Sequence, residues 1–316
     1  MNKKTIFENR IAVIILAVLT CLLWGSAFPM IKTGYLSYGI ASSDIASQIL
    51  FAGTRFTISG MLIILIGSLI QKKKPKVPKS NWSMIIKLSM FQTVGQYVFF
   101  YMGLANATGS NGAIIDGSAA LVTVVIAGLI YKEDKMTFRK SLGTILGFLG
   151  IFIVAVSGGN SEFGFSMAGE GMLLIATFSC GLASVLIKVY SQHINPIFLC
   201  GYQFIFGGVL MAIFSYNFGG RLDGINPGNV YILIYLAILS MLAYTTWSIL
   251  LKYNSAAKIG VYGFLVPVFG VMMSTIILKE NPANIYTLSS LILVCMGIIL
   301  VNRDKKININ KMSKRA

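Results

Sequence analysis

Long apolar stretches, separated by short polar segments, run along almost the whole chain. Each stretch is about 17 to 25 residues long, which is the length that an α-helix needs to cross the hydrocarbon core of a bilayer. The stretches are too long and too uniformly apolar for the alternating strands of a membrane β-barrel. The pattern therefore predicts ten membrane-spanning helices, at residues 11–32, 45–70, 83–103, 110–131, 139–157, 170–190, 196–217, 229–251, 256–278 and 284–302.

The second half of the chain repeats the first. At a constant offset of 147 residues, Tyr97 falls on Tyr244 and Glu133 falls on Glu280, and no gap is needed from the third span to the fifth. Each copy holds five spans, and an odd number of spans reverses the direction of the second copy in the membrane. Many secondary transporters use this inverted arrangement to build one central site that opens to alternate sides.

The first two spans of each copy match more loosely, with Gly25 on Gly181 and Phe56 on Phe204. We therefore expect an all-α integral membrane protein of two inverted five-helix repeats. The expected limits are 11–157 for the first repeat, 158–169 for a linker, 170–302 for the second repeat and 303–316 for a basic cytoplasmic tail.

The charged residues predict the orientation of the chain. Only 11% of its 316 residues are charged, about half the share of a soluble domain. The net charge is +16, but the basic residues cluster in the segments between spans, so they indicate topology and not a nucleic-acid partner. With both termini on one side, 22 of the 26 Lys and Arg residues lie on that side. We expect the cytoplasmic membrane, with both termini in the cytoplasm.

Few residues could support enzyme chemistry. The four cysteines lie within apolar runs and lack the spacing of a metal site or a disulfide framework. His193, the only histidine, falls in a predicted cytoplasmic loop, and the HExxH pattern of zinc proteases is missing. We expect no enzyme activity, no catalytic residues, no metal and no cofactor. The alternative from another class is a membrane scaffold or receptor that transports nothing.

Several short motifs occur in a specific order: WGSAFPMIK at 24–32, RF at 55–56, YKED at 131–134, PVFG at 267–270 and LKEN at 278–281. Together they resemble the EamA-like family of the drug/metabolite transporter superfamily, over about residues 11 to 302. The resemblance implies ten helices in two inverted repeats around a central cavity. It also implies secondary transport of small metabolites, often the export of amino acids or other polar solutes.

Two positions depart from the pattern. Ala120 stands where the second copy has Pro267, so the fourth span is expected to lack the bend of the ninth. Asp116 is not expected as a general residue of the family, which assigns it to substrate choice. Glu133 and Glu280, at span ends, are expected to cap helices or to pair with nearby lysines.

Two ionisable residues lie deep within spans. Arg55 is about 15 Å and Asp116 about 9 Å along their helices at 1.5 Å per residue. A charge at such depth costs several kcal/mol unless it is paired or hydrated. Either the two charges neutralise each other and hold two helices together, or they line a cavity and bind a substrate or a proton. Both lie in the first copy alone, because Gln203 and Gly263 stand at the equivalent positions.

Polar and aromatic side chains supply the other candidates for a binding site. Gln92 and Gln96 are four residues apart on the third span, so they share a helix face that should meet protein or a wet cavity. Four aromatic residues are candidates for the cavity wall, because their faces can hold an apolar group or a cation. They are Trp24, Tyr97, Tyr244 and Trp247. The alternative is that they pack helices or anchor them at the membrane surface.

Arg55 would attract a carboxylate and Asp116 an amine or a proton. The residues therefore favour efflux of a small zwitterion, such as an amino acid, by alternating access. The second hypothesis is an organic cation or drug, bound by Asp116 and the aromatic wall, with Arg55 structural. Because the chain has no ATP-binding motif, transport should be driven by a coupling proton or a counter-substrate.

The orientation can be tested by cysteine labelling in whole cells. A cysteine added after Ala316 should be protected from a membrane-impermeant maleimide, because the positive-inside distribution places this end in the cytoplasm. Arg221→Cys, in a predicted external loop, should react. The reverse labelling pattern would contradict the orientation.

Overall fold

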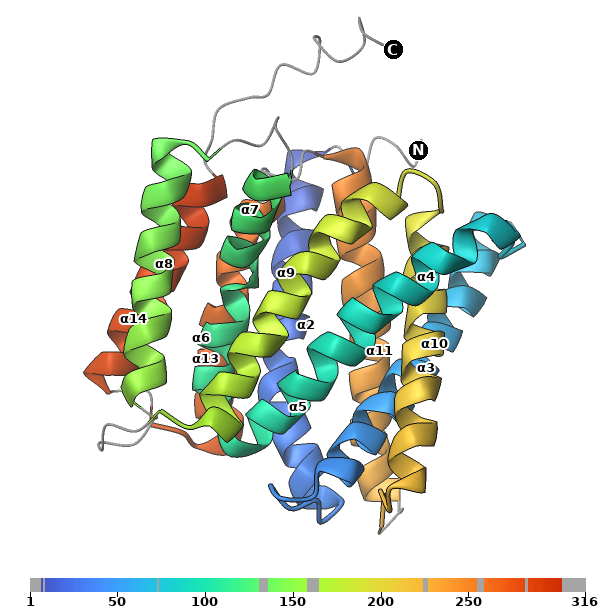
Figure 1. Ribbon diagram of the computed structural model, residues 1–316, viewed down its shortest axis with the longest axis horizontal. Coiled ribbons are helices and arrows are strands. Elements are labelled where there is room, and N and C mark those ends of the chain that lie inside the picture. Colours follow the sequence, from blue (N-terminus) through green and yellow to red (C-terminus); the bar gives the residue numbers. More distant parts are fainter. Residues whose placement is uncertain are drawn as a thin grey trace, which may run out of the picture.

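The structure is a computed structural model of the chain, and it describes residues 7, 9–72, 74–130, 136–157, 165–223, 227–254, 259–281 and 284–302. Glu133, most of the expected linker and the expected basic tail lie outside the described residues. In the described part, the regular elements are all helices (Figure 1). They are α2 (Arg10–Ser37), α3 (Ile45–Gln71), η1 (Lys79–Asn81), α4 (Trp82–Leu88), η2 (Ser89–Gly95), α5 (Gln96–Asn106), α6 (Gly109–Gly117), α7 (Ala119–Ile130), α8 (Phe138–Ser157), η3 (Met167–Gly171), α9 (Met172–Tyr190), α10 (Pro196–Asn217), α11 (Pro227–Tyr253), η4 (Val261–Phe264), α13 (Leu265–Leu278) and α14 (Ile285–Asn302).

The helices confirm the predicted fold class. Nine helical segments among the described residues are long and apolar enough to cross a membrane. The span predicted at 83–103 is also helical, but it is divided into α4, a π-helical turn (η2) and α5. Together these three elements are about 37 Å long, enough to cross a bilayer. The start of α2 and the end of α14 lie on the same side of the bundle, which we call the terminal side (Figure 1).

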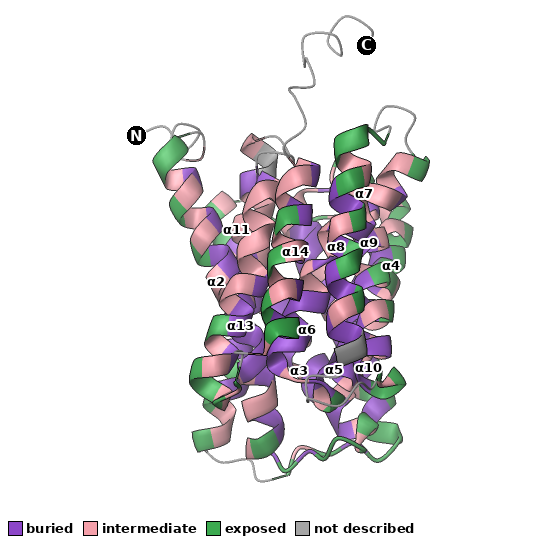
Figure 2. Cartoon of the chain, turned by 90° about the vertical axis from the view of Figure 1, so that its left-hand side faces the viewer, coloured by how far each residue is buried: buried purple, intermediate pink, exposed green. Residues whose placement is uncertain are grey.

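The outer surface of the bundle is apolar. Large hydrophobic side chains such as Leu36, Phe152 and Phe178 are exposed on the helices, whereas the buried positions lie between them (Figure 2). A soluble protein rarely exposes apolar patches of this extent. The exposed faces are therefore those that a surrounding bilayer would cover.

Glycines bring α3 and α10 together at the centre of the bundle. An added Cβ atom on Gly53 would lie 2.8 Å from the Gly208 oxygen, and one on Gly60 would lie 2.7 Å from the Gly201 oxygen. Residue numbers rise along one helix as they fall along the other, so the two helices are antiparallel. Each glycine pair also maps onto the other when the repeats are exchanged, as an inverted repeat requires.

The outer pair of helices repeats this geometry. An added Cβ on Gly143 of α8 would lie 2.9 Å from the Gly297 oxygen of α14, and one on Gly150 would lie 2.8 Å from the Ser290 oxygen. These positions are equivalent at the offset of 147 residues. Small residues let membrane helices approach closely, which explains why they mark both crossings.

The first helix of each repeat packs against the fourth helix of the other. An added Cβ on Gly25 of α2 would lie 2.6 Å from the Phe269 Cβ, and one on Gly181 of α9 would lie 2.6 Å from the Val122 Cγ1. Val122 and Phe269 are equivalent at the offset of 147. The repeats are thus interlocked through matching contacts.

The fourth span is interrupted between α6 and α7, which corrects the expectation that it would lack a bend. The Ser118 hydroxyl donates to the Ile115 carbonyl at 2.5 Å, and the Ser118 amide donates to the same oxygen at 3.1 Å. The ring of Pro267 packs so closely on Gly117 that an added Cβ would lie 2.9 Å from it. The helix is therefore interrupted without a proline of its own, at a residue that bonds back to Ile115 and beside a glycine that contacts Pro267.

Gly60→Ala tests the central crossing. The added methyl group would meet backbone atoms of α10 at 2.7 Å, so we expect an overpacking cost of about 1–3 kcal/mol and a lower melting temperature in detergent. Gly263→Ala is the matched control, because an added Cβ there would meet no atom within 4 Å. Equal melting temperatures for the two variants would contradict the close approach of α3 and α10.

Candidate functional site

Four aromatic side chains meet at the centre of the bundle, and we call them the aromatic quartet: Phe56, Tyr97, Phe204 and Tyr244. The Tyr97 and Tyr244 hydroxyl groups share a hydrogen bond. Ring centroids are 4.1 Å apart for Phe56 and Tyr97, and 4.9 Å apart both for Phe204 and Tyr244 and for Phe56 and Phe204. Each residue thus contacts its own equivalent, so the pseudo-twofold axis between the repeats passes through the quartet.

Arg55 lies beside the quartet and is held by neutral oxygen atoms. Its Nε donates to the Leu236 carbonyl at 3.2 Å, Nη2 donates to Ser240 Oγ at 2.8 Å, and Nη1 donates to the Tyr101 hydroxyl at 2.7 Å. The guanidinium also lies 5.0 Å from the centre of the Phe56 ring. It is 3% exposed, and no carboxylate contacts it in the described part of the chain.

Asp116 is partly exposed and is the last residue but one of α6, two residues before the break at Ser118. Its Oδ1 atom is buried and has no hydrogen-bond partner among the described residues. Its side chain lies near those of Tyr97 and Cys180. Arg55 and Asp116 do not form an ion pair, although both side chains lie near Tyr97.

Each of the two charges lies close to a landmark on its own span. The glycine contacts place the crossing of α3 and α10 midway between Gly53 and Gly60, so Arg55 is displaced from it by roughly 2 Å along the axis. Asp116 precedes the break at Ser118 by two residues, or about 3 Å. Both displacements point away from the terminal side, because α3 and α6 run toward that side (Figure 1).

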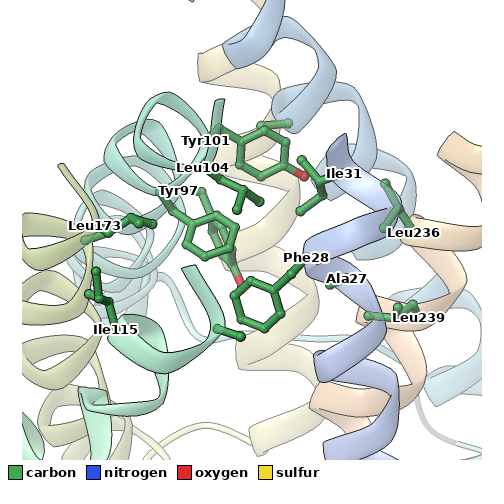
Figure 3. Packing of buried hydrophobic residues seen from close by; sticks show 14 of the residues in the cluster. Ala27, Phe28, Ile31, Tyr97, Tyr101, Leu104, Ile115, Leu173, Leu236 and Leu239 are labelled. Atoms are coloured by element: carbon green, nitrogen blue, oxygen red, sulfur yellow. The ribbon is translucent and has the colours of Figure 1, made fainter. Parts of the chain in front are cut away.

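Three aromatic side chains, Trp24, Tyr244 and Trp247, form an aromatic wall beside the centre of the bundle. The ring centroid of Trp24 lies 5.5 Å from that of Tyr244 and 5.1 Å from that of Trp247, and all three side chains are partly exposed. Figure 3 shows Tyr97 and Tyr101 of α5 directed toward α2, where Phe28 lies. The structure therefore brings together the four aromatic residues that the sequence nominated.

The two glutamines lie on the divided third span. Gln92 is in the π-helical turn and Gln96 begins α5, and both are buried. Gln96 Oε1 has no hydrogen-bond partner in the part of the chain that the structure describes. Neither side chain has a described hydrogen bond to Arg55 or Asp116. Thr93, between them, donates to Gln203 Oε1 at 2.5 Å and ties the turn to α10.

Two charged side chains hold the turn between α5 and α6, at the end of the bundle opposite the terminal side. Glu280 accepts hydrogen bonds from the Gly109 amide at 2.6 Å and from the Ser110 amide at 2.9 Å, so it caps α6 as expected. Lys32 Nζ donates to the Ala107 carbonyl at 2.5 Å, just after the end of α5. The turn between α5 and α6 is therefore held at both of its ends. In the sequence, the repeated motif around Glu280 indicated this cap.

A separate apolar groove of about 520 Å³ lies between α7, α8 and α9. Its walls include Val125, Phe148 and Leu182, and its two hydroxyl residues, Ser118 and Thr177, already donate to backbone carbonyls. No ionisable side chain lines it. The groove therefore suits hydrocarbon and offers nothing to a polar solute.

Comparison with known proteins gives consistent matches over most of the chain. Residues 11–156 and 167–303 each match the EamA-like transporter family. An uncharacterized transporter of Archaeoglobus fulgidus is 25% identical over 299 residues, covering 92% of this chain and 99% of the relative. The uncharacterized transporter YvbV of Bacillus subtilis is 25% identical over 288 residues, covering 90% of each. A solved crystal structure shares the fold, with a TM-score of 0.66 and 15% identity over 98% of this chain and 100% of that one.

A double-mutant cycle tests the hydrogen bond on the axis. Tyr97→Phe and Tyr244→Phe should each lower stability by about 0.5–1.5 kcal/mol, because each leaves the other hydroxyl without its partner. The double variant should cost no more than either single one. Strictly additive losses of unfolding free energy would show that the hydroxyl groups do not interact.

Proposed function

Since the chain belongs to the EamA-like transporter family, we propose that it exports a small zwitterion, such as an amino acid, by alternating access. It is a multi-pass membrane transporter and not an enzyme. The proposed location is the cytoplasmic membrane, with both termini in the cytoplasm. The proposed repeats, residues 11–157 and 170–302, rock against each other about the axis through the aromatic quartet.

One observation supports a zwitterion above other solutes. Two side chains of opposite charge lie within the spans near Tyr97, and neither has a charged partner among the described residues. An unpaired charge within the membrane costs several kcal/mol. A ligand that carries both an ammonium and a carboxylate compensates Asp116 and Arg55 at once.

The hydrogen-bonding capacity of the two groups fits this ligand. The buried Oδ1 of Asp116 lacks a donor, and an ammonium supplies up to three. A guanidinium has five N–H groups, and the three oxygen partners of Arg55 leave some of them for a carboxylate. After one substrate molecule has left and before the next one binds, a coupling proton or a counter-substrate would take the place of the ammonium at Asp116.

A second candidate function is the export of an organic cation. It is favoured by the deep burial of Arg55 and by its contacts with three neutral partners, which suit a structural role. The partly exposed wall of Trp24, Tyr244 and Trp247 would then hold the cation together with Asp116.

Matched ligands separate the two candidates. Thermal-shift assays would compare L-alanine with ethylamine and propionate, and L-leucine with isoamylamine and 4-methylpentanoate. Each amino acid should stabilise the purified protein more than its amine or its acid, because it alone compensates both charges. Equal stabilisation by amine and amino acid would favour the organic cation. No stabilisation by any of these ligands would contradict both readings.

Asp116→Asn tests the direct role of the carboxylate. Loss of the negative charge should weaken amino-acid binding and slow efflux from proteoliposomes by about ten-fold or more, because the ammonium loses a charge-assisted bond. Glu170→Gln is the control. Glu170 is a buried carboxylate, and its described partners, Asn111 and Ser166, lie at the end of the bundle opposite the terminal side. Normal transport by a normally folded Asp116→Asn protein would exclude Asp116 from the site.

A further inference from the structure

Gly263 stands at the position equivalent to Asp116, and it faces open space. An added Cβ atom on Gly263 would meet no other atom within 4 Å, unlike the glycines at the helix crossings. Gly263 belongs to the short turn η4, and none of the four residues of that turn is buried. The second repeat therefore leaves room at the place where the first repeat carries a carboxylate.

Two matching hydrogen bonds fix this equivalence in space. Thr177 Oγ1 donates to the Ile115 carbonyl at 3.4 Å, and Cys21 Sγ donates to the Tyr262 carbonyl at 3.3 Å. The two donors, Cys21 and Thr177, are separated by the same number of residues as Gly25 and Gly181. The two acceptors, Ile115 and Tyr262, are 147 residues apart. The residues that follow the two acceptors, Asp116 and Gly263, thus hold the same place within their repeats.

Arg55, the other deep charge, also has an uncharged counterpart in the second repeat. Arg55 is bound to Ser240, and the equivalent pair in the other half is Gln203 with Thr93. Gln203 is buried, and its Nε2 has no hydrogen-bond partner among the described residues. The polar framework is therefore present in both halves, whereas both charges lie in one half.

We propose that Gly263 lines the substrate site from the second repeat, across the axis from Asp116, and that its missing side chain makes room for the uncharged part of the substrate. This inference rests on the proposed function. Tyr262 contacts Cys21, and Trp24 lies one turn further along α2, so the aromatic wall adjoins this space. The ligand is an amine or zwitterion whose ammonium binds Asp116 and whose side chain extends toward Gly263.

Charge transplantation tests the inference. If both positions border one site, a carboxylate at residue 263 can bind the same ammonium from the opposite side of the axis. We compare the wild type, Asp116→Asn, Asp116→Asn with Gly263→Asp, and Asp116→Asn with Gly263→Asn, using L-leucine and isoamylamine as probes. The aspartate should recover at least about ten-fold in affinity over the matched asparagine.

The outcomes distinguish this inference from the proposed function. A folded Gly263→Asp double variant that binds no better than the Gly263→Asn double variant overturns the role of Gly263. Undiminished binding by Asp116→Asn alone overturns the proposed function instead. Thermal melting of each variant without ligand shows whether it is folded.

Thiol accessibility supplies a readout that does not depend on transplanted charge. In a background with Cys21, Cys180, Cys200 and Cys295 replaced by alanine, Gly263→Cys should react with aminoethyl methanethiosulfonate, and bound L-leucine should slow the reaction. Ser274→Cys is the control, because Ser274 lies on the following helix, α13, and is fully buried. An unreactive Gly263→Cys in protein that still binds L-leucine would overturn the inference.

Discussion

The hydrogen bond between the Tyr97 and Tyr244 hydroxyl groups is the contact about which the molecule is arranged. Two equivalent residues can touch only where a twofold axis passes between them, so this bond fixes how the two repeats face each other. The contact of Phe56 with Phe204 and the glycine crossing of α3 with α10 lie on the same axis. Two inverted copies of one helix bundle are thereby joined along that axis.

The helix contacts are symmetric between the repeats, but the two charges deep within the spans are not. Arg55 and Asp116 belong to the first repeat, and their counterparts are a neutral amide and a residue without a side chain. The asymmetry has a physical benefit for transport. Four buried charges around one axis would double the desolvation cost, whereas one charge of each sign suffices for a zwitterion. The second repeat can then contribute space, at Gly263, and an aromatic wall near Trp247.

Much of the fold could be predicted from the sequence, because a membrane helix is recorded in its length and hydropathy. The repeat likewise made Tyr97 and Tyr244 equivalent, and it marked Glu280 as a cap. The contact between the tyrosines could not be predicted, since equivalence does not say which residues lie on the axis. The π-helical turn at Ser89–Gly95 was also missed, because adding one residue to a turn leaves almost no trace in hydropathy.

The partners of Arg55 were missed for a related reason. Ser240 and Tyr101 come from other helices, and their approach depends on how those helices are rotated, which a single sequence does not record. The break at Ser118 depends in the same way on the Ile115 carbonyl, which also accepts a bond from Thr177 on α9. Such features become predictable only when the packing of neighbouring helices is known.

The central claim is that one substrate is held by its two charged groups, with the carboxylate at Arg55 and the ammonium at Asp116. Calorimetric binding of L-leucine, isoamylamine and 4-methylpentanoate to wild type, Arg55→Gln and Asp116→Asn tests it most directly. We expect Arg55→Gln to abolish the preference for L-leucine over isoamylamine, and Asp116→Asn to abolish the preference for L-leucine over 4-methylpentanoate. If Arg55→Gln keeps the wild-type preference for L-leucine over isoamylamine, Arg55 does not bind the carboxylate and the account is wrong.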